Sequence, residues 1–484
     1  MTQTQTRTLS AVGLTALIGG QLLSQLDFAA VNVALHSIGQ QLGASGAQLE
    51  LVVAGYGVAF AVALVLGGQL GDAVGRRTVF VVGVAGFLLA SLWCGLAPTT
   101  GVLLVARAAQ GLTAALVVPQ VLATIHVTTS GRQSVRALAL YGSIGGLSFV
   151  VGQVLGGVLV GADVLGLGWR AVFLINVPIS LGVLALARFV PQTRAPRRPQ
   201  VDLLGTVLLG GTLVALMLPA ALGPALGWPW WTVVLVCLVP LGFASLAAVE
   251  RRREARGLDA LVPPTVLRIP SMRTGLLLGA LFFGSWSGLL FALTLTVQAG
   301  GARTATATGL MFVPLGLAFF LAASRSARLA VRLGPARTIR VGVVVQVLGV
   351  LATTLVVLAG HAGGAWIQPG LVLVGVGNGV IVASVFRFCL ADVPAALAGS
   401  ASAVVSTVQQ ASLGLGAPVL GSAYLVAARS TGSPERGFAA AMVVEVAMVV
   451  AVGLVAEVAS RSARRTARTD RDAPVPADLV GRNT

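Results

Sequence analysis

The chain has 484 residues, of which 56% are hydrophobic and only 10% are charged. A soluble domain carries about 25% charged residues, so this composition excludes an ordinary soluble protein and points to the membrane. The net charge of +17 comes from arginine alone. Because the arginines lie between apolar runs and do not cluster, they do not predict a nucleic-acid-binding protein. Cys94, Cys237 and Cys389 lie far apart in apolar runs and form neither a metal-binding spacing nor a disulfide framework.

Apolar segments long enough to cross a bilayer follow one another along the chain. A spanning helix needs about 20 mostly apolar residues, and charged residues interrupt the sequence at about that interval. Two uncharged runs, 203–249 and 341–386, are too long for one helix, and each contains a glycine-rich break that divides it into two. The sequence predicts fourteen helices, near 9–33, 50–70, 78–97, 101–127, 136–161, 168–189, 203–222, 229–249, 273–298, 306–324, 340–360, 367–390, 399–427 and 437–459.

Arginine is concentrated in every second connection between these helices. With the N-terminus placed in the cytoplasm, 26 of the 32 basic residues fall on the cytoplasmic side. The exceptions are Arg170, Arg303, Arg429 and Arg436, which fall outside, and Arg107 and Arg387, which fall within spans. This asymmetry follows the positive-inside rule, so we expect both termini in the cytoplasm. The lysine-free, arginine- and alanine-rich composition favours a bacterial source, and hence a multi-pass protein of the bacterial inner membrane.

A weak internal repeat indicates two related halves. "GQLGDAVGRRTVFVVG" (68–83) and "ARLAVRLGPARTIRVG" (327–342) share the spacing of their leucines and glycines, and both are basic cytoplasmic connections. Transporters often contain such repeats. Asp72 of the first copy is replaced by Val331 in the second. The expected division is an N-terminal six-helix bundle (1–190), a two-helix central insert with linkers (191–270), a C-terminal six-helix bundle (271–460) and a disordered cytoplasmic tail (461–484).

Four motifs carry a family likeness. "GGQLGDAVGRRTVF" (67–80) resembles the loop 2–3 signature of the major facilitator superfamily. "LDFAAVNVAL" (26–35), "RAAQGLTAALVVPQ" (107–120) and "GWRAVFLINVPI" (168–179) are similar to helix 1, helix 4 and helix 5–6 motifs of its fourteen-helix drug:proton antiporters. The resemblance implies an all-α membrane protein with two six-helix bundles and a two-helix insert, which exports drugs by alternating access.

The helix 5 motif of this family is only partly kept. The family usually has a Gly-Pro pair where this chain has Gly152 and Gln153, while Gly156 and Gly157 are retained. Close helix packing is therefore expected, but a proline bend is not. His36 also stands where a proline often ends helix 1.

Three charged residues are expected inside the membrane, where ionisable groups usually have a function. Asp27 lies in helix 1 and either caps an interfacial turn or faces a central cavity, where it binds a proton or a cationic substrate. Arg107 of helix 4 lies at a comparable depth and either extends to the interface or responds to the protonation of Asp27. The resemblance suggests a part for Arg107 in proton coupling. Glu445 of the last helix is a possible second proton site or cation contact.

Polar and aromatic residues in the spans are candidates for a substrate cavity. They are Asp27, Tyr56, Gln110, Trp286, Asn378, Gln409 and Gln410. Gln409 and Gln410 are adjacent, so at most one points squarely into a cavity. Packing or interhelical hydrogen bonding is the commoner role for such residues.

The loop 2–3 residues are expected to form a cytoplasmic gate. They are Gly71, Asp72, Gly75, Arg76 and Arg77. The glycines permit a tight turn, and Asp72 can pair with arginine or a helix N-terminus in one conformation and release it in the other. The alternative is that the arginines only fix orientation.

Taken together, the sequence predicts a proton-coupled exporter of lipophilic drugs or antibiotics that works as a monomer with no cofactor, metal or ATP. No GxxxxGK[ST] loop for ATP is present. Proton-coupled uptake of a small metabolite on the same fold is the alternative. A membrane enzyme is less favoured because its histidines, His36, His126 and His361, are scattered, and a sensor is less favoured because the chain has no soluble signalling domain.

Overall fold

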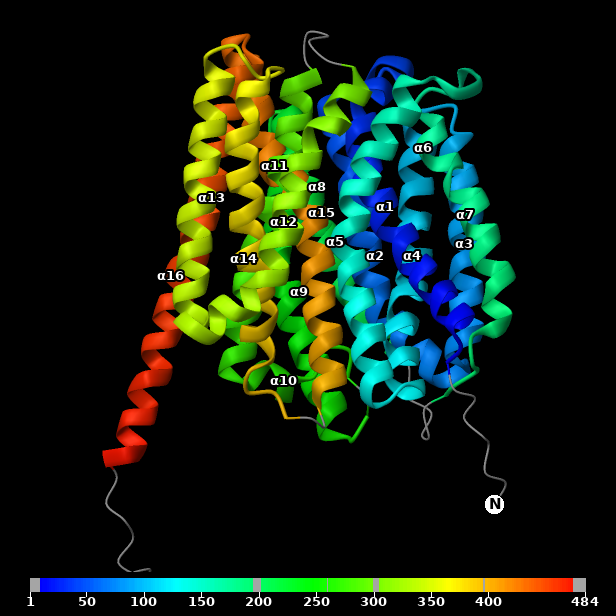
Figure 1. The fold of residues 1–484 in the computed structure, drawn as a ribbon, viewed down its shortest axis with the longest axis vertical. Coiled ribbons are helices and arrows are strands. Elements are labelled where there is room, and N and C mark those ends of the chain that lie inside the picture. The colour runs from blue at the N-terminus through cyan, green and yellow to red at the C-terminus, as the bar shows by residue number, and fades with distance from the viewer. Residues whose placement is uncertain (1–8, 195–201, 259, 299–303, 395–396, 473–484) are drawn as a thin grey trace, which may run out of the picture.

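The computed structural model describes residues 9–194, 202–258, 260–298, 304–394 and 397–472. All regular elements in these ranges are helices, and they stand side by side in one bundle (Figure 1). Thirteen of the described helices are long and apolar enough to cross a membrane. The 31-residue helix α5 takes the remaining place in the series, and its segment Val151–Gly161 is apolar. The prediction of an all-α membrane protein is confirmed.

The first half of the chain forms the helices before the central insert. They are α1 (Ala11–Leu42), α2 (Gly46–Val74), α3 (Arg76–Gly95), α4 (Thr100–Thr128), α5 (Gly131–Gly161), the 3-10 turn η1 (Val164–Gly166), α6 (Arg170–Leu174), α7 (Asn176–Leu186) and the 3-10 turn η2 (Ala187–Phe189). The insert contains α8 (Leu203–Leu226) and α9 (Trp230–Ala255).

The second half follows the short helix α10 (Pro264–Arg268). Its elements are α11 (Pro270–Gln298), α12 (Ala305–Leu333), α13 (Pro335–Leu358), the 3-10 turn η4 (Ala365–Ile367), α14 (Gln368–Leu390), α15 (Ala398–Thr431) and α16 (Pro434–Asp472). The beginning of α1 and the end of α16 lie at the same end of the molecule (Figure 1), as an even number of crossings requires.

Helix boundaries follow local capping more closely than charge. The predicted end of helix 1 near residue 33 is wrong, because α1 continues past His36 to Leu42, where Gly43 adopts a left-handed conformation (φ 63°) that ends it. The predicted helix over 168–189 is confirmed as one membrane span, Arg170–Phe189; α6 and α7 are separated only at Ile175, whose backbone stays right-handed helical (φ −61°, ψ −27°). The last helix was predicted to end at 459, but α16 runs to Asp472, so the first part of the tail expected to be disordered is helical. Residues 473–484 lie outside the described residues.

The two halves meet along two pairs of helices. α2 packs against α15, and α5 packs against α12. A Cβ atom on Gly57 would come within 2.5 Å of the Gly414 backbone, and one on Gly309 within 2.4 Å of the Gln153 carbonyl oxygen. Small residues thus let the helix backbones touch across the seam. The insert helix α8 packs against both α2 and α15 and so lies beside the seam; the division into bundles at 190 and 270 remains a prediction.

Candidate functional site: a buried charge network

Asp27 lies at the centre of a polar network within the first half. Asp27 lies in the middle of α1 and is fully buried. One carboxylate oxygen accepts from the Arg107 guanidinium at 2.6 Å, and the other accepts from the side-chain amides of Gln110 at 2.9 Å and Asn176 at 2.8 Å. Helices α1, α4 and α7 therefore each supply one part of a carboxylate site that is closed to solvent.

Arg107 completes the network from α4. Besides Asp27, it donates to the Gln110 side-chain oxygen at 2.6 Å and to the Val52 backbone carbonyl of α2 at 3.1 Å. Its guanidinium carbon lies 4.4 Å from the centre of the Tyr56 ring, a cation–π distance. The buried cation is thus held by one anion, two neutral acceptors and an aromatic face. This satisfies the requirement that a buried charge be paired.

These contacts decide between the alternatives raised by the sequence. Asp27 is far from either end of α1 and caps no turn. Arg107 is fully buried and does not extend to an interface. Arg107 and Asp27 instead form a direct ion pair, and the expected response of Arg107 to the protonation of Asp27 remains a prediction. In this conformation the Asp27 carboxylate is held by side chains of α4 and α7 in its own half.

Tyr56 and Gln110, expected to line a substrate cavity, belong to the same network. The Tyr56 hydroxyl donates to the Ser24 carbonyl at 3.1 Å, which fixes its ring beneath Arg107. The Gln110 amide donates both to Asp27 and to Ser91 of α3 at 2.9 Å. Ser91 was not recognised in the sequence, where a single serine in an apolar helix gives no signal.

A second buried acid lies in the other half. Glu445 of α16 is fully buried and accepts from the Gln346 amide of α13 at 3.0 Å. Ser285 of α11 lies beside the same carboxyl. No ion pair to Glu445 occurs among the described residues. Its environment is therefore polar but lacks the compensating cation that Asp27 has.

The other proposed cavity residues are spread over the second half. Trp286 is almost buried, with its ring 5.9 Å from that of Phe319 in a stacked pair between α11 and α12. Asn378 is fully buried and donates to the Val374 carbonyl of its own helix. Gln410 is buried while Gln409 is half-buried, consistent with the two side chains facing different ways. The structure does not bring these residues into the Asp27 network.

The loop 2–3 motif forms a compact turn between α2 and α3. Gly75 has φ 124° and separates the two helices without an intervening loop. Arg76 pairs with Asp72 at 2.7 Å, one helical turn away, and its backbone N–H donates to Thr193 at 2.9 Å. A Cβ on Gly71 would collide with the Gln120 side chain of α4. Arg77 is half-buried beside them, so the motif is a rigid corner in which Asp72 and Arg76 pair with each other.

The glycines of the helix 5 motif mark a close crossing. Cβ atoms on Gly152 and Gly156 would lie 2.6 Å and 2.7 Å from the Leu26 and Ala30 carbonyl oxygens of α1. Gly157 faces the other way, against Gly309 of α12. The helix passes this point as one continuous element, so the motif brings α5 against both α1 and the opposite half.

The insert is anchored by one acid, Asp202, which was not among the predicted site residues. Asp202 caps the start of α8 and pairs with Arg253 of α9 at 3.2 Å, while its backbone N–H donates to Gln69 of α2 at 3.1 Å. An aspartate just before an apolar run is a recognisable helix-start signal. These contacts fix α8 and α9 to the first half.

Comparison with known proteins places this architecture in a family. The model of the "Major Facilitator Superfamily" matches residues 17–417. The chain belongs to the major facilitator superfamily. Family membership, predicted from four motifs, is thereby confirmed, and the protein is a multi-pass membrane protein.

Several similar proteins of known name are bacterial. The chain is 35% identical over 437 residues to the "Probable actinorhodin transporter" of Streptomyces coelicolor, covering 89% of this chain and 75% of that protein. It is 36% identical to a puromycin resistance protein of Streptomyces alboniger, covering 84% and 80%. It is 31% identical to the "Multidrug resistance protein Stp" of Mycobacterium tuberculosis, covering 90% and 79%.

Solved structures of other transporters share the fold at low sequence identity. A POT family transporter in complex with 5-aminolevulinic acid matches with a TM-score of 0.66 and 14% identity, covering 92% of this chain and 96% of that one. A bacterial homologue of the lysosomal transporter Spinster, in an inward-facing and occupied conformation, matches with a TM-score of 0.61 and 16% identity, covering 93% and 96%.

Proposed function

We propose that this major facilitator exports lipophilic antibiotics or related drugs in exchange for protons. Relatives that cover most of the chain are antibiotic transporters and resistance proteins. The observation that carries the coupling step is the closed Asp27–Arg107 pair, because a single proton on Asp27 would neutralise the anion that compensates the buried arginine.

The protonation of Asp27 would change how α1, α4 and α7 hold one another. All three donors to the Asp27 carboxylate lie on other helices: Arg107 and Gln110 on α4, and Asn176 on α7. A neutral carboxylic acid accepts fewer hydrogen bonds than a carboxylate, and it leaves the positive charge of Arg107 uncompensated. An uncompensated buried charge strongly destabilises the packing around it. Arg107 would then move toward its remaining acceptors, Val52 on α2 and Gln110. Since α2 lies on the seam between halves, this movement biases the packing of α2 against α15.

Glu445 is proposed as a second proton site in the other half. It contacts α13 and α11 through neutral groups only, so a proton there changes the charge of that half without breaking an ion pair. The loop 2–3 corner is proposed as the cytoplasmic gate, the helix 5 glycines as the point where the halves slide, and both termini as cytoplasmic. The exporter is proposed to work as a monomer.

The direct test is transport by inverted membrane vesicles under an imposed pH gradient, with ethidium as the fluorescent cation. Export predicts that acidifying the vesicle interior drives ethidium into the lumen, and that Asp27→Asn abolishes this gradient-driven accumulation. Accumulation that ignores the gradient would reject proton antiport, whereas gradient-driven movement in the opposite direction would favour uptake. Undiminished coupling in Asp27→Asn would transfer the proton role to Glu445.

A further inference from the structure

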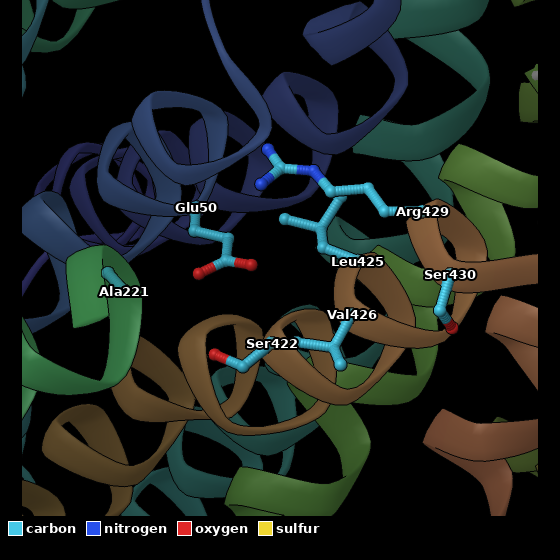
Figure 2. Close-up of a pocket in the computed structure, with 7 residues that line it drawn as sticks. All are labelled: Glu50, Ala221, Ser422, Leu425, Val426, Arg429 and Ser430. Carbon is cyan, nitrogen blue, oxygen red and sulfur yellow. The ribbon is translucent and has the colours of Figure 1, made fainter. Parts of the chain in front are cut away.

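A cavity of about 360 Å³ lies where the insert meets the seam between the halves. Figure 2 shows Glu50 entering it from α2, Ala221 from α8 and the remaining residues from the last turns of α15. The lining residues are Glu50, Ala221, Ser422, Leu425, Val426, Arg429 and Ser430. It lies near the start of α2, away from the end of the molecule that holds the start of α1 (Figure 1). None of these residues belongs to the Asp27 network.

Glu50 is an unusual residue to find at the inner wall of this cavity. Its side chain is fully buried, yet neither carboxylate oxygen has a hydrogen-bond partner. A buried carboxylate normally requires a donor or a cation because leaving it unpaired costs several kcal/mol. Arg429 acts on Glu50 electrostatically from the rim but does not hydrogen-bond to it. The Glu50 carboxylate therefore lines the cavity as a buried acceptor without a hydrogen-bond partner.

Helix α15 packs directly against this carboxylate. A Cβ atom on Gly421 of α15 would lie 2.6 Å from a Glu50 oxygen, so any larger residue there would require the Glu50 side chain to move. The Ser422 hydroxyl donates to the Ala220 carbonyl of α8 at 2.6 Å, which ties α15 to the insert at this level. The cavity is thus bounded by three helices, α2, α8 and α15, two of which are joined by a hydrogen bond at this level.

The remaining lining has a polarity that selects a type of ligand. Ala221, Leu425 and Val426 give apolar walls, while Arg429 and Ser430 are exposed at the rim. An acid at the floor favours a cationic donor, and a guanidinium at the rim favours an oxygen acceptor. The volume falls in the range of small-molecule sites, which begins at about 300 Å³.

We propose that this cavity binds a monovalent organic amine whose ammonium group reaches Glu50, whose apolar body lies along α8 and α15, and whose oxygen acceptors face Arg429. The inference rests on the proposed export function in one respect, which is that the bound amine is the exported compound near its point of release. Glu50 lies six residues before Tyr56 on α2, about 9 Å along the helix. The two sites thus share one helix at the seam.

The test is binding to the purified full-length protein in detergent, without any gradient. The probe is N-(2-aminoethyl)dansylamide, which carries an ammonium group, an apolar ring system and sulfonyl oxygens, and which fluoresces more strongly in apolar surroundings. N-propyldansylamide, which lacks the charge, measures non-specific partition. We expect the wild type to prefer the amine, and Glu50→Gln to lose that preference by about tenfold to a hundredfold, the range for a hydrogen bond to a charged group.

Two further variants keep the result interpretable. Glu435→Gln removes an acid at the start of α16, outside the cavity, and should leave binding unchanged. Val426→Trp fills the cavity from an exposed position while keeping Glu50, and should abolish binding of the amine. Equal affinity of wild type and Glu50→Gln, or an equal affinity for the two probes, would overturn the site. Either result would leave gradient-driven export standing, whereas Glu50-dependent binding in a protein without proton-driven transport would reject only the proposed function.

Discussion

The sharpest prediction concerns the energetic coupling of Asp27 and Arg107. Both side chains are completely buried and their charged atoms are 2.6 Å apart. Removing one member of such a pair leaves an uncompensated charge and costs about 3–5 kcal/mol of unfolding free energy. Asp27→Asn replaces an acceptor with an amide whose nitrogen would face the donors of Arg107, Gln110 and Asn176, so its effect should lie in this range. Arg107→Gln should cost a similar amount.

The double variant Asp27→Asn, Arg107→Gln distinguishes charge pairing from packing. Because it leaves no buried charge, its loss should be smaller than the sum of the single losses by about 1.5 kcal/mol or more. Unfolding in mixed micelles with increasing SDS, followed by tryptophan fluorescence, measures all three variants. Arg436→Gln, an exposed residue on α16, is the control and should change stability by less than about 0.5 kcal/mol. Additivity of the single effects within about 0.5 kcal/mol would refute the reasoning.

Three other variants test the remaining features. Gly156→Ala would place a methyl group 2.7 Å from the Ala30 carbonyl oxygen and should lower the unfolding free energy by about 1–3 kcal/mol. Gly182→Ala, the control, has open space around it and should be neutral or slightly stabilising. The same SDS unfolding measures both variants, and equal effects would contradict the close crossing of α5 and α1. Asp72→Asn breaks a partly exposed pair and should cost at most about 1 kcal/mol of stability while slowing export in vesicles; normal export would remove the gating role. Glu445→Gln should keep the fold, because an amide can still pair with Gln346, but should lower the number of protons exchanged per ethidium in proteoliposomes with a trapped pH indicator; an unchanged ratio would exclude Glu445 as a proton site.

Sequence reasoning succeeded where a residue conflicts with its surroundings. A charge within an apolar run can be recognised without coordinates, and the similar depths of Asp27 and Arg107 in helices 1 and 4 were enough to suggest that the two residues act together. The direction in which a side chain points from its helix was harder to predict from the sequence. The contacts of Tyr56 and Gln110 with the charge pair were not predicted, because the sequence does not show which way a polar side chain points from its helix; their part in a substrate cavity remains a prediction.

Glu50 shows how a small boundary error can hide a site. The predicted second helix began at residue 50, which placed this acid at the membrane interface, where acids are common. The structure begins α2 at Gly46, with Ser45 and Gln48 forming a reciprocal capping box. That pattern of serine and glutamine three residues apart is readable in the sequence, and it moves Glu50 into the second turn, where it is buried.

The two buried acids proposed as coupling sites have different surroundings in the two halves. Asp27 accepts from three donors and compensates an arginine, so its network is complete only while the carboxylate carries its charge. Glu445 faces an amide and a hydroxyl, and a proton there leaves no cation unpaired. Under the proposed mechanism, protonation of Asp27 should therefore disrupt the packing of the first half, whereas protonation of Glu445 should leave the packing of the second half intact. A proton bound at Asp27 should then act as the trigger for rearrangement at α2, while one bound at Glu445 should only change the charge carried through the cycle. It follows that neutralising Asp27 should impair both stability and the conformational change, whereas neutralising Glu445 should affect stoichiometry alone.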